Sequence, residues 1–462
     1  MWISMILLSA ILFLFLCLIN LRLSFLIILA LLPSYLIRFN IFSIPVTFLE
    51  MMIIILFFIF VISNLPKAGE KSLRHDKSTY KGSLALLGTT KYFAVLILLF
   101  ILSATLSIFI SPDLRAAAGI WKAYFIEPII LLLIGLNLFR PAKTAATAGG
   151  GTEGALNSKN IIFALSVSAL LVGIFAIYQK FTGFMAPYTF WGKGGVFRVT
   201  SFYGFPNAIG LFLAPLIPLF INGLVSGSRI TRPTVPVRNG REFGMTEKWH
   251  GMTGLFYILI IILSIISIYF AHSTGALVAL FSGLLITGLF FKKTKIFSII
   301  ILIIFFLLFS LNFIPQKIQD ELLLKDWSGF VRKVGWQESL EMLKNNFIFG
   351  AGLSGYPEVF AEYHKIDFIE IFQYPHNIIL NFWSEIGLFG LLIFILLIIY
   401  YYARIIKSKG NIWLKFALFW SMMVILIHGL VDAPYFKNDL AILFWVLFLL
   451  VLLNYETSKN TT

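Results

Sequence analysis

Residues 296–314 read IFSIIILIIFFLLFSLNFI, an apolar run that contains no charged side chain. In a helix, about 20 such residues cross the roughly 30 Å of hydrocarbon in a lipid bilayer. Similar runs recur from one end of the chain to the other. Hydrophobic residues make up 59% of the 462 positions and charged residues only 12%, about half the charged fraction of a soluble domain. Because hydrocarbon offers the backbone no hydrogen-bond partner, we predict an all-α, polytopic transmembrane helix bundle.

The boundaries of the apolar runs place the individual spans. Thirteen spans are predicted, or twelve, because the first two apolar segments are short. The thirteen segments lie near residues 2–19, 22–37, 43–63, 92–110, 117–139, 161–180, 205–223, 253–271, 275–291, 296–314, 378–400, 413–431 and 440–454.

The net charge of +15 is spread over the segments that connect these spans. A nucleic-acid-binding protein gathers its basic residues on one soluble surface, and no soluble domain is predicted here. Lysines and arginines are dense in 64–91, 224–252 and 401–412, which the positive-inside rule assigns to the cytoplasm. The alternation of spans then places 315–377, the longest connection, on the outer side. The sequence therefore predicts one large outer loop and no nucleic-acid partner.

The outer loop 315–377 carries a helical pattern of its own. Four large apolar residues follow the i, i+4, i+7, i+11 spacing of an amphipathic helix, namely Trp336, Leu340, Leu343 and Phe347. Gly350 and Gly352 end this helix, and Pro357 opens a second short helix that runs to Tyr363. We expect these short helices to lie over the mouth of the bundle.

Four stretches in the second half of the chain form a recognisable pattern. They are, in chain order, RVTSFYGFPN at 198–207, Arg332 and Trp336 ahead of GAG at 350–352, YPHN at 374–377 ahead of EIGLFG at 385–390, and HGLVD at 428–432. Their order and spacing resemble the O-antigen ligase family, which also includes polymerases of lipid-linked glycans. The resemblance covers roughly 190–455. We therefore divide the chain into N-terminal transmembrane helices at 1–190 and an O-antigen ligase-like domain at 191–455.

This resemblance implies a function. Members of that family transfer a glycan from an undecaprenyl diphosphate carrier to an acceptor hydroxyl, which belongs to lipid A-core in the ligases and to another glycan repeat unit in the polymerases. The resemblance implies an inverting reaction, with no metal ion and no cofactor, at the outer face of the bacterial cytoplasmic membrane and among membrane lipids. The choice between ligase, polymerase and protein O-glycosyltransferase stays open, as do the sugar and the oligomeric state.

Such a transfer needs a base for the acceptor hydroxyl and positive charge for the leaving diphosphate. His376 is the candidate base, because it lies at the outer start of the eleventh span, where the helix dipole disfavours a protonated ring. The alternative for His376 is a cap on an interfacial helix. Arg198 and Arg332 are the candidate diphosphate ligands, since a guanidinium group binds phosphate bidentately. The alternative for both is an arginine at the level of the lipid headgroups.

Five further polar residues are expected to support the site: Asn207, His272, Asn377, Glu385 and Asp432. Glu385 lies inside a span, where an ionisable side chain is costly without a partner. Asp432 and His428 are four residues apart, which predicts a hydrogen-bonded pair on one face of a helix. Gly387 is expected to let two helices pack closely.

One position departs from the family pattern. Many members have Ser-Arg-Gly between the eighth and ninth spans, with the arginine on the diphosphate, and this chain has HSTG at 272–275. Thr274 therefore stands in place of that arginine. Two alternatives follow for binding of the diphosphate. Either the two candidate arginines neutralise its charge, with help from Arg115 or Lys122, or His272 contributes to diphosphate binding.

Two other classes of membrane protein also fit the hydropathy. A transporter or flippase for lipid-linked glycans would need many spans and buried polar residues, but the repeated halves and paired broken spans typical of transporters are missing from the sequence. A nucleotide-sugar glycosyltransferase would need an acidic metal-binding pair facing the cytoplasm, and no Asp-x-Asp occurs. The transporter is the main alternative to a glycan transferase.

Overall fold

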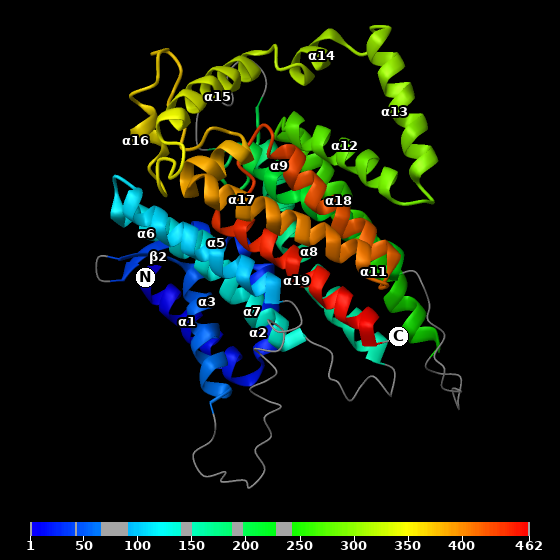
Figure 1. The fold of residues 1–462 in the computed structure, drawn as a ribbon. Helices are drawn as coiled ribbons and strands as arrows, with labels where there is room; N and C mark the ends of the chain where they lie inside the picture. The colour runs from blue at the N-terminus through cyan, green and yellow to red at the C-terminus, as the bar shows by residue number, and fades with distance from the viewer. Residues whose placement is uncertain are drawn as a thin grey trace.

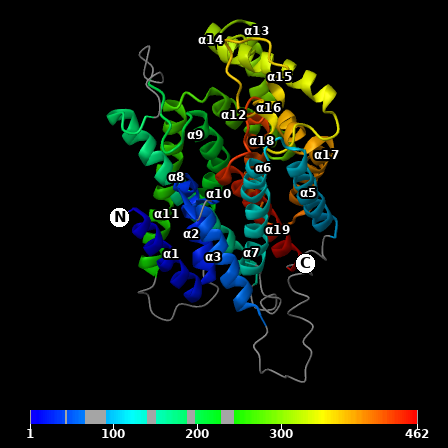
Figure 2. The ribbon, with the colours of Figure 1, turned by 90° about the vertical axis from the view of Figure 1, so that its left-hand side faces the viewer.

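In the computed structural model, the chain forms a helical bundle that is covered at one end by the 315–377 segment (Figures 1 and 2). The structure describes residues 2–41, 44–65, 91–139, 150–186, 197–227 and 243–460. Six of the described helical segments are long and apolar enough to cross a membrane, and seven further apolar helices are shorter. The all-α polytopic class is confirmed.

The six long segments are α5 (Lys91–Ile110), α6 (Leu114–Ile120) with α7 (Glu127–Phe139), α8 (Gly150–Thr182), α9 (Asn207–Leu213) with α10 (Ile217–Gly227), α17 (Ile378–Lys407) and α19 (Asn438–Asn460). The seven shorter apolar segments are Ser4–Ile19 in α1 (Trp2–Ile19), α2 (Leu21–Ala30), α3 (Phe48–Ser63), Gly254–Phe270 in α11 (Phe243–Phe270), α12 (Thr274–Phe290), α13 (Lys295–Ser310) and α18 (Ile412–His428). Each predicted span coincides with one of these segments over most of its length, except the span at 22–37.

Helix α19 forms the centre of the bundle. It packs against α7, α8 and α17, and 94% of its apolar window Asn438–Tyr455 is buried inside the protein. Three aromatic rings of this helix, Phe444, Trp445 and Phe448, contact one another within the core. A helix that is apolar on all sides is expected in such a position, because every face of it contacts other helices.

The predicted span at 22–37 is wrong. Helix α2 ends at Ala30, and a short 3₁₀ turn follows at Leu32–Leu36. Pro33 lies at the start of this turn, where its missing N–H and its ring prevent the α-helix from continuing. A helix of 10 residues is about 15 Å long, which is half the thickness of the hydrocarbon layer. Helix α2 is therefore too short to cross on its own.

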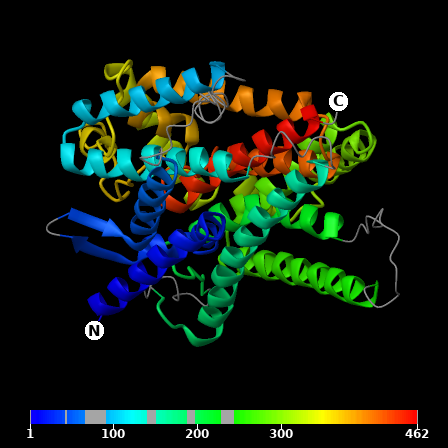
Figure 3. The same ribbon diagram turned by 90° about the horizontal axis from the view of Figure 1, so that it is seen from below.

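A β-hairpin follows α2 and projects from the side of the bundle (Figure 3). Strand β1 (Arg38–Ile41) pairs antiparallel with β2 (Ile44–Thr47). Helix α3 then begins at Phe48, later than the predicted start at 43. The Thr47 side chain accepts from the Glu50 N–H, and the Glu50 side chain accepts from the Thr47 N–H. This capping box fixes the start of α3 because it satisfies backbone donors that a helix end leaves without partners.

Two of the long segments change their helical geometry at a proline. Between α6 and α7, residues Trp121–Ile126 form a π-helix directly ahead of Glu127 and Pro128. Between α9 and α10, residues Ala214–Leu216 form a 3₁₀ turn that contains Pro215. Proline cannot donate the next hydrogen bond of an α-helix, so the turns beside it widen or tighten. Each segment nevertheless continues as one span.

The 315–377 segment is folded, as predicted. Its helices are α14 (Gln316–Leu322), α15 (Trp327–Asn345) and α16 (Tyr356–Phe360). Helix α15 is the predicted amphipathic helix, but its buried face differs from the predicted one. Leu343 is fully buried, whereas Leu340 and Phe347 are exposed. Ser339 and Met342 lie on the buried face instead, because this face turns toward α16 and α17.

Helix α17 is interrupted inside the predicted eleventh span. Ile386 and Gly387 have non-helical backbone angles, and Gly387 has a φ of 72°. Ile348, from the segment after α15, enters this break, where its carbonyl accepts a 2.9 Å hydrogen bond from the Leu388 N–H. A Cβ at position 387 would lie 2.3 Å from that carbonyl oxygen. Gly387 is therefore not the helix-packing glycine that was predicted. It permits a left-handed backbone and a close approach of the loop.

Gly350 serves the same insertion, whereas Gly352 lies against the end of α5, where a Cβ would approach the Ser111 nitrogen to 2.5 Å. Ala351 donates a 2.7 Å hydrogen bond to the Ser384 carbonyl, which the break in α17 leaves without a helical partner. At Gly350, φ is 67° and a Cβ would lie 2.3 Å from the Trp383 carbonyl oxygen. The backbone groups freed by the break thus bond to the loop, as a site inside a membrane requires.

Candidate active site

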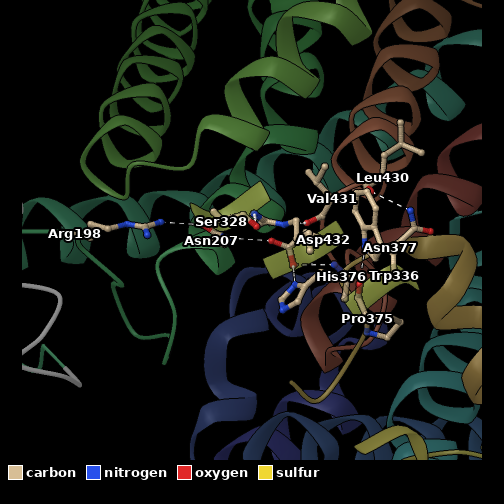
Figure 4. Close-up of polar contacts among 12 residues, drawn as sticks. Arg198, Asn207, Ser328, Trp336, Pro375, His376, Asn377, Leu430, Val431 and Asp432 are labelled. Carbon is tan, nitrogen blue, oxygen red and sulfur yellow. Dashed lines mark hydrogen bonds and ion pairs between the residues drawn. The ribbon is translucent and has the colours of Figure 1, made fainter. Parts of the chain in front are cut away.

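Four chain segments meet at the end of the bundle that lies beneath α15. They are 197–207 ahead of α9, the turn 271–273 between α11 and α12, 374–377 ahead of α17, and 429–437 between α18 and α19. Hydrogen bonds join the four segments into one network (Figure 4). Because each segment adjoins a helix end, the bundle fixes its position while its polar groups remain available for contacts.

His376 and Asp432 form the centre of this network. The Nδ1 atom of His376 lies 3.1 Å from Oδ1 of Asp432. The Asp432 side chain is buried, with 6% of its surface exposed, and the His376 side chain is 30% exposed. His376 also has a φ of 50°, an uncommon backbone conformation for this residue that tends to occur at functional sites. Since Nδ1 faces the carboxylate, Nε2 is the ring nitrogen that can face a substrate.

Asp432 is held in its ionised form. Burial alone would raise the pKa of this carboxyl group, but the hydrogen bond to His376 and the charges of His376, His428 and Arg332 outweigh burial. They hold the pKa of Asp432 well below its usual range. Its Oδ1 atom also accepts a 2.9 Å hydrogen bond from the Ala433 N–H. Across the described residues, no group of three or more His, Cys, Asp or Glu side chains is arranged to hold a metal ion.

Asn207 connects this pair to Arg198. Its Nδ2 atom donates a 3.1 Å hydrogen bond to Oδ2 of Asp432, and its Oδ1 atom accepts a 3.0 Å hydrogen bond from Nη2 of Arg198. Figure 4 shows Arg198, Asn207, Asp432 and His376 in one continuous chain of contacts. Residues that are 9 to 225 positions apart in sequence are thereby brought into one polar cluster.

Arg198 also contacts the turn between α11 and α12. Its Nε atom donates to the Ala271 carbonyl at 3.0 Å, and its Nη2 atom donates to the His272 carbonyl at 3.3 Å. Burial and the nearby charge of Arg332 lower the pKa of Arg198. Two guanidinium groups are therefore close enough to repel each other at this end of the bundle, an arrangement that an anion between them would stabilise.

Arg332 reaches the same cluster from α15. Its Nε atom donates a 2.7 Å hydrogen bond to the carbonyl of Val431, the residue before Asp432. One turn further along α15, the Nε1 atom of Trp336 donates a 2.9 Å hydrogen bond to the carbonyl of Pro375, the residue before His376. Helix α15 is thus hydrogen-bonded both to the segment that carries His376 and to the segment that carries Asp432.

Asn377 connects the 374–377 segment to α17 and to the segment ahead of Asp432. Its Oδ1 atom accepts from the Ile379 and Leu380 N–H groups, which makes it the N-cap of α17. Its Nδ2 atom donates a 3.1 Å hydrogen bond to the Leu430 carbonyl. Asn377 therefore holds the 374–377 segment against the segment that carries Asp432.

The predicted pair between Asp432 and His428 does not form. Helix α18 ends at His428, so Asp432 does not continue the same helical face. No hydrogen-bond partner of the buried His428 Nδ1 atom is present among the described residues, and the ring lies against Gly275, where a Cβ would approach it to 3.3 Å. Asp432 is bonded to His376 and Asn207 instead.

Glu385 lies away from the central pair. It is fully buried in α17, and its Oε2 atom accepts a 2.7 Å hydrogen bond from the Ser354 N–H. The residue lies directly before the break at Ile386 and Gly387. Glu385 therefore holds the inserted loop in place, and it makes no contact with His376 in the part of the chain that the structure describes.

The turn that carries Thr274 contributes backbone groups to the site. The carbonyl of His272 bonds to Arg198, while the His272 ring is exposed and packs beside Tyr269. Burial and the charge of Arg198 lower the pKa of His272. Lys122, a cation considered as a replacement for the missing arginine, forms an ion pair with Glu50.

A small cavity lies between α15 and the chain leading to His376. Its lining includes Arg332, Glu338, His364, Phe372 and His376. Nδ1 of His364 lies 2.9 Å from Oε2 of Glu338, and Nε2 lies 2.9 Å from the Ile369 carbonyl oxygen. Both neighbours present acceptor oxygens, an arrangement that favours the protonated imidazole, in which both ring nitrogens donate. Sequence reasoning missed this pair, because no pattern relates two residues 26 positions apart.

The cationic His364 makes the stability of this region depend on pH. Burial lowers the pKa of His364, but the bonds to Glu338 and Ile369 and the charges of Glu338 and Asp367 raise it above its ordinary value. The resulting stabilisation is fully present below the unfolded-state pKa of about 6.5 and is lost as pH rises through the raised pKa.

We therefore expect the melting temperatures of the wild type and His364→Gln to differ most in acid and to converge in alkaline solution. Thermal unfolding of both proteins from about pH 5 to about pH 9 measures this difference. A difference that stays constant over the whole range would contradict the assignment of a cationic His364.

Comparison with known proteins agrees with the resemblance seen in the motifs. Residues 259–395 match the family model described as O-Antigen ligase. This range contains Arg332, His376 and Glu385, whereas Arg198 and Asp432 lie outside it. A comparison with curated proteins gives no match. Residues 259–395 are therefore similar to the O-antigen ligase family.

Proposed function

We propose that the protein transfers a glycan from an undecaprenyl diphosphate carrier to an acceptor hydroxyl at the outer face of the bacterial cytoplasmic membrane. One observation carries the proposal: the buried carboxylate of Asp432 bonds both to His376 and, through Asn207, to Arg198. A candidate base and a candidate phosphate ligand are thus held in one network. The match to the O-antigen ligase family supports the same class of reaction.

In this proposal His376 is the general base. The carboxylate of Asp432 accepts the hydrogen bond from Nδ1–H of the neutral ring, which leaves the lone pair on Nε2 to accept a proton. As the acceptor oxygen attacks the anomeric carbon, its proton passes to Nε2. The bond between that carbon and the phosphate oxygen breaks, and the diphosphate leaves with the bonding electrons. Attack opposite to the leaving group inverts the configuration and requires no metal ion or cofactor.

The environment of the His376 ring differs from the one predicted from the sequence. Asn377 is the N-cap of α17, so His376 precedes the helix and pairs with a carboxylate. The helix dipole is therefore not the main influence on its ring. Asp432 acts as a positioning residue, because it fixes the orientation and the tautomer of the base and stabilises the imidazolium that proton transfer creates.

The leaving diphosphate is assigned to Arg198 and Arg332. Arg198 donates hydrogen bonds to the carbonyls of Ala271 and His272 and to the side chain of Asn207. A guanidinium group forms charge-assisted hydrogen bonds with phosphate oxygens, and the nearby charge of Arg332 favours an anion between the two groups. Charge that develops on the leaving group would be stabilised most in the transition state.

A reconstituted reaction tests the proposed function. The purified protein in lipid nanodiscs would receive a lipid-linked glycan donor together with either lipid A-core or a second lipid-linked repeat unit. We expect glycan to appear on one acceptor and undecaprenyl diphosphate to be released in equal amount. Movement of the intact donor across a vesicle membrane without any transfer would support the transporter alternative instead.

Topology provides a separate test of the proposed outer face. In a protein whose Cys17 has been replaced, Glu362→Cys and Lys409→Cys place single thiols at exposed positions at opposite ends of the bundle. An impermeant thiol reagent added to intact cells is expected to label Glu362→Cys and not Lys409→Cys, because the basic segment at 401–412 should lie in the cytoplasm. The reverse labelling pattern would refute the proposed orientation. Labelling of both variants after cell disruption is the control for accessibility.

A further inference from the structure

Lys437 lies close to the candidate active site and belongs to none of the motifs. It ends the connection 429–437 between α18 and α19, the same connection that carries Asp432. Its Nζ atom lies over the ring of Tyr203, 4.8 Å from the ring centroid. Tyr203 belongs to the 197–207 segment that carries Arg198. Lys437 therefore joins the same two segments that the bond between Asn207 and Asp432 joins.

The ammonium group of Lys437 has an unusual environment. Its side chain is half-buried, and across the described residues its Nζ atom forms no ion pair and no hydrogen bond. Burial lowers the pKa of Lys437, whereas Asp439 and Asp432 act in the opposite direction and Arg38 adds to the effect of burial. A cation that is partly removed from water is costly unless a counterion or acceptor reaches it.

The nearby carboxylates are only partly occupied by other partners. Asp432 bonds to His376 and Asn207. Oδ1 of Asp439 accepts a 3.0 Å hydrogen bond from the Leu440 N–H, whereas its buried Oδ2 atom has no hydrogen-bond partner among the described residues. The face of the Tyr203 ring offers some stabilisation to a cation, but it provides no oxygen acceptor for the N–H donors of the ammonium group. An anionic ligand with several oxygen atoms is the kind of group that these donors fit.

We propose that Lys437 binds the diphosphate of the lipid-linked donor together with Arg198 and Arg332. This inference rests on the proposed function and adds a third cation to its binding site. A lysine contacts phosphate as a point charge and needs no bidentate geometry. Lys437 would therefore contribute mainly to donor affinity and less to the chemical step.

Kinetics of Lys437→Met and Lys437→Arg test this inference. Loss of a charged hydrogen bond is expected to raise the KM for the donor and the Kd for undecaprenyl diphosphate roughly tenfold or more in Lys437→Met. The KM for the acceptor should be unchanged, and Lys437→Arg should retain most of the affinity because it keeps the charge. Lys415→Met is the matched control, since Lys415 is also half-buried but bonds to the Ser408 carbonyl at the opposite end of the bundle.

The outcomes separate this inference from the proposed function. An unchanged donor KM and an unchanged carrier affinity in Lys437→Met would overturn the inference. The same holds if only the melting temperature falls, because Lys437 would then only balance the charge of Asp439. A wild-type protein that neither transfers glycan nor binds undecaprenyl diphosphate would overturn both. If Lys437→Met does not fold, chemical modification of the wild-type protein tests the inference instead. Undecaprenyl diphosphate should protect Lys437 from an amine-reactive reagent, as read by mass spectrometry, and equal modification with and without it would also overturn the inference.

Discussion

Replacing His376 with alanine is expected to reduce glycan transfer by roughly 10²–10⁴-fold, the usual contribution of a general base. Binding of the lipid carrier should persist, because the base serves the acceptor and the arginines serve the donor. Single-turnover rates of the purified variant, together with its affinity for undecaprenyl diphosphate, measure the two effects separately. Transfer by His376→Ala at a near wild-type rate would remove His376 from the mechanism. Lost carrier binding would instead identify it as a diphosphate ligand.

Asp432→Asn tests the same model from the other side of the pair. An amide at this position can present its NH₂ group to Nδ1, which favours the wrong tautomer of the ring, so a loss of up to about 10⁴-fold is expected with the fold intact. The ¹⁵N shifts of the His376 ring report which nitrogen carries the proton, and a purely structural role of Asp432 would leave them unchanged. His250→Ala, in the segment 224–252 predicted to lie on the opposite side, is a matched control for His376→Ala.

Acid should also inactivate the enzyme through His376, because an imidazolium cannot accept the proton of the hydroxyl. Asp432 stays ionised during this change, since its pKa is held well below its usual range. A rate that does not decline in acid would therefore argue against a histidine base.

The second large effect is expected at Arg198. Arg198→Ala should reduce kcat/KM for the donor by roughly 10²–10³-fold if its guanidinium stabilises charge that develops on the leaving diphosphate. Arg198→Lys should also be impaired, because an ammonium keeps the charge but loses the fork that reaches Asn207 and the carbonyls of the 271–273 turn. Donor kinetics and the affinity for undecaprenyl diphosphate are the measurements.

Two controls accompany the Arg198 variants. Arg404→Lys changes an arginine at the opposite end of α17, where Arg404 lies over the ring of Tyr400, and it should leave activity unchanged. The melting temperature of each variant shows whether loss of the bonds to Ala271 and His272 has unfolded the turn. Wild-type glycan assembly by well-folded Arg198→Ala in a complementation assay would exclude Arg198 from the site.

The class of the protein and nearly all of its helices could be predicted from the amino-acid sequence. Apolar length is sufficient for this, because a backbone in hydrocarbon must form its hydrogen bonds locally. Span alternation also placed Arg198, Arg332 and His376 at one end of the bundle, where the structure brings them together. The division of the chain at residue 190 stays a prediction. The short α2 and the hairpin after it were missed, since hydropathy does not register the effect of Pro33.

The pairing of the site residues depends on tertiary contacts, which the sequence pattern did not predict. The four-residue spacing of His428 and Asp432 predicts a contact only if the helix continues, and α18 ends at His428. Asp432 is then free to turn toward His376, 56 positions away, and toward Asn207, 225 positions away. The pair of His364 with Glu338 and the position of Lys437 over Tyr203 arise in the same way. The spacing of residues along the sequence predicts contacts only within one helix or strand. The contacts described here depend on how the ends of separate helices meet.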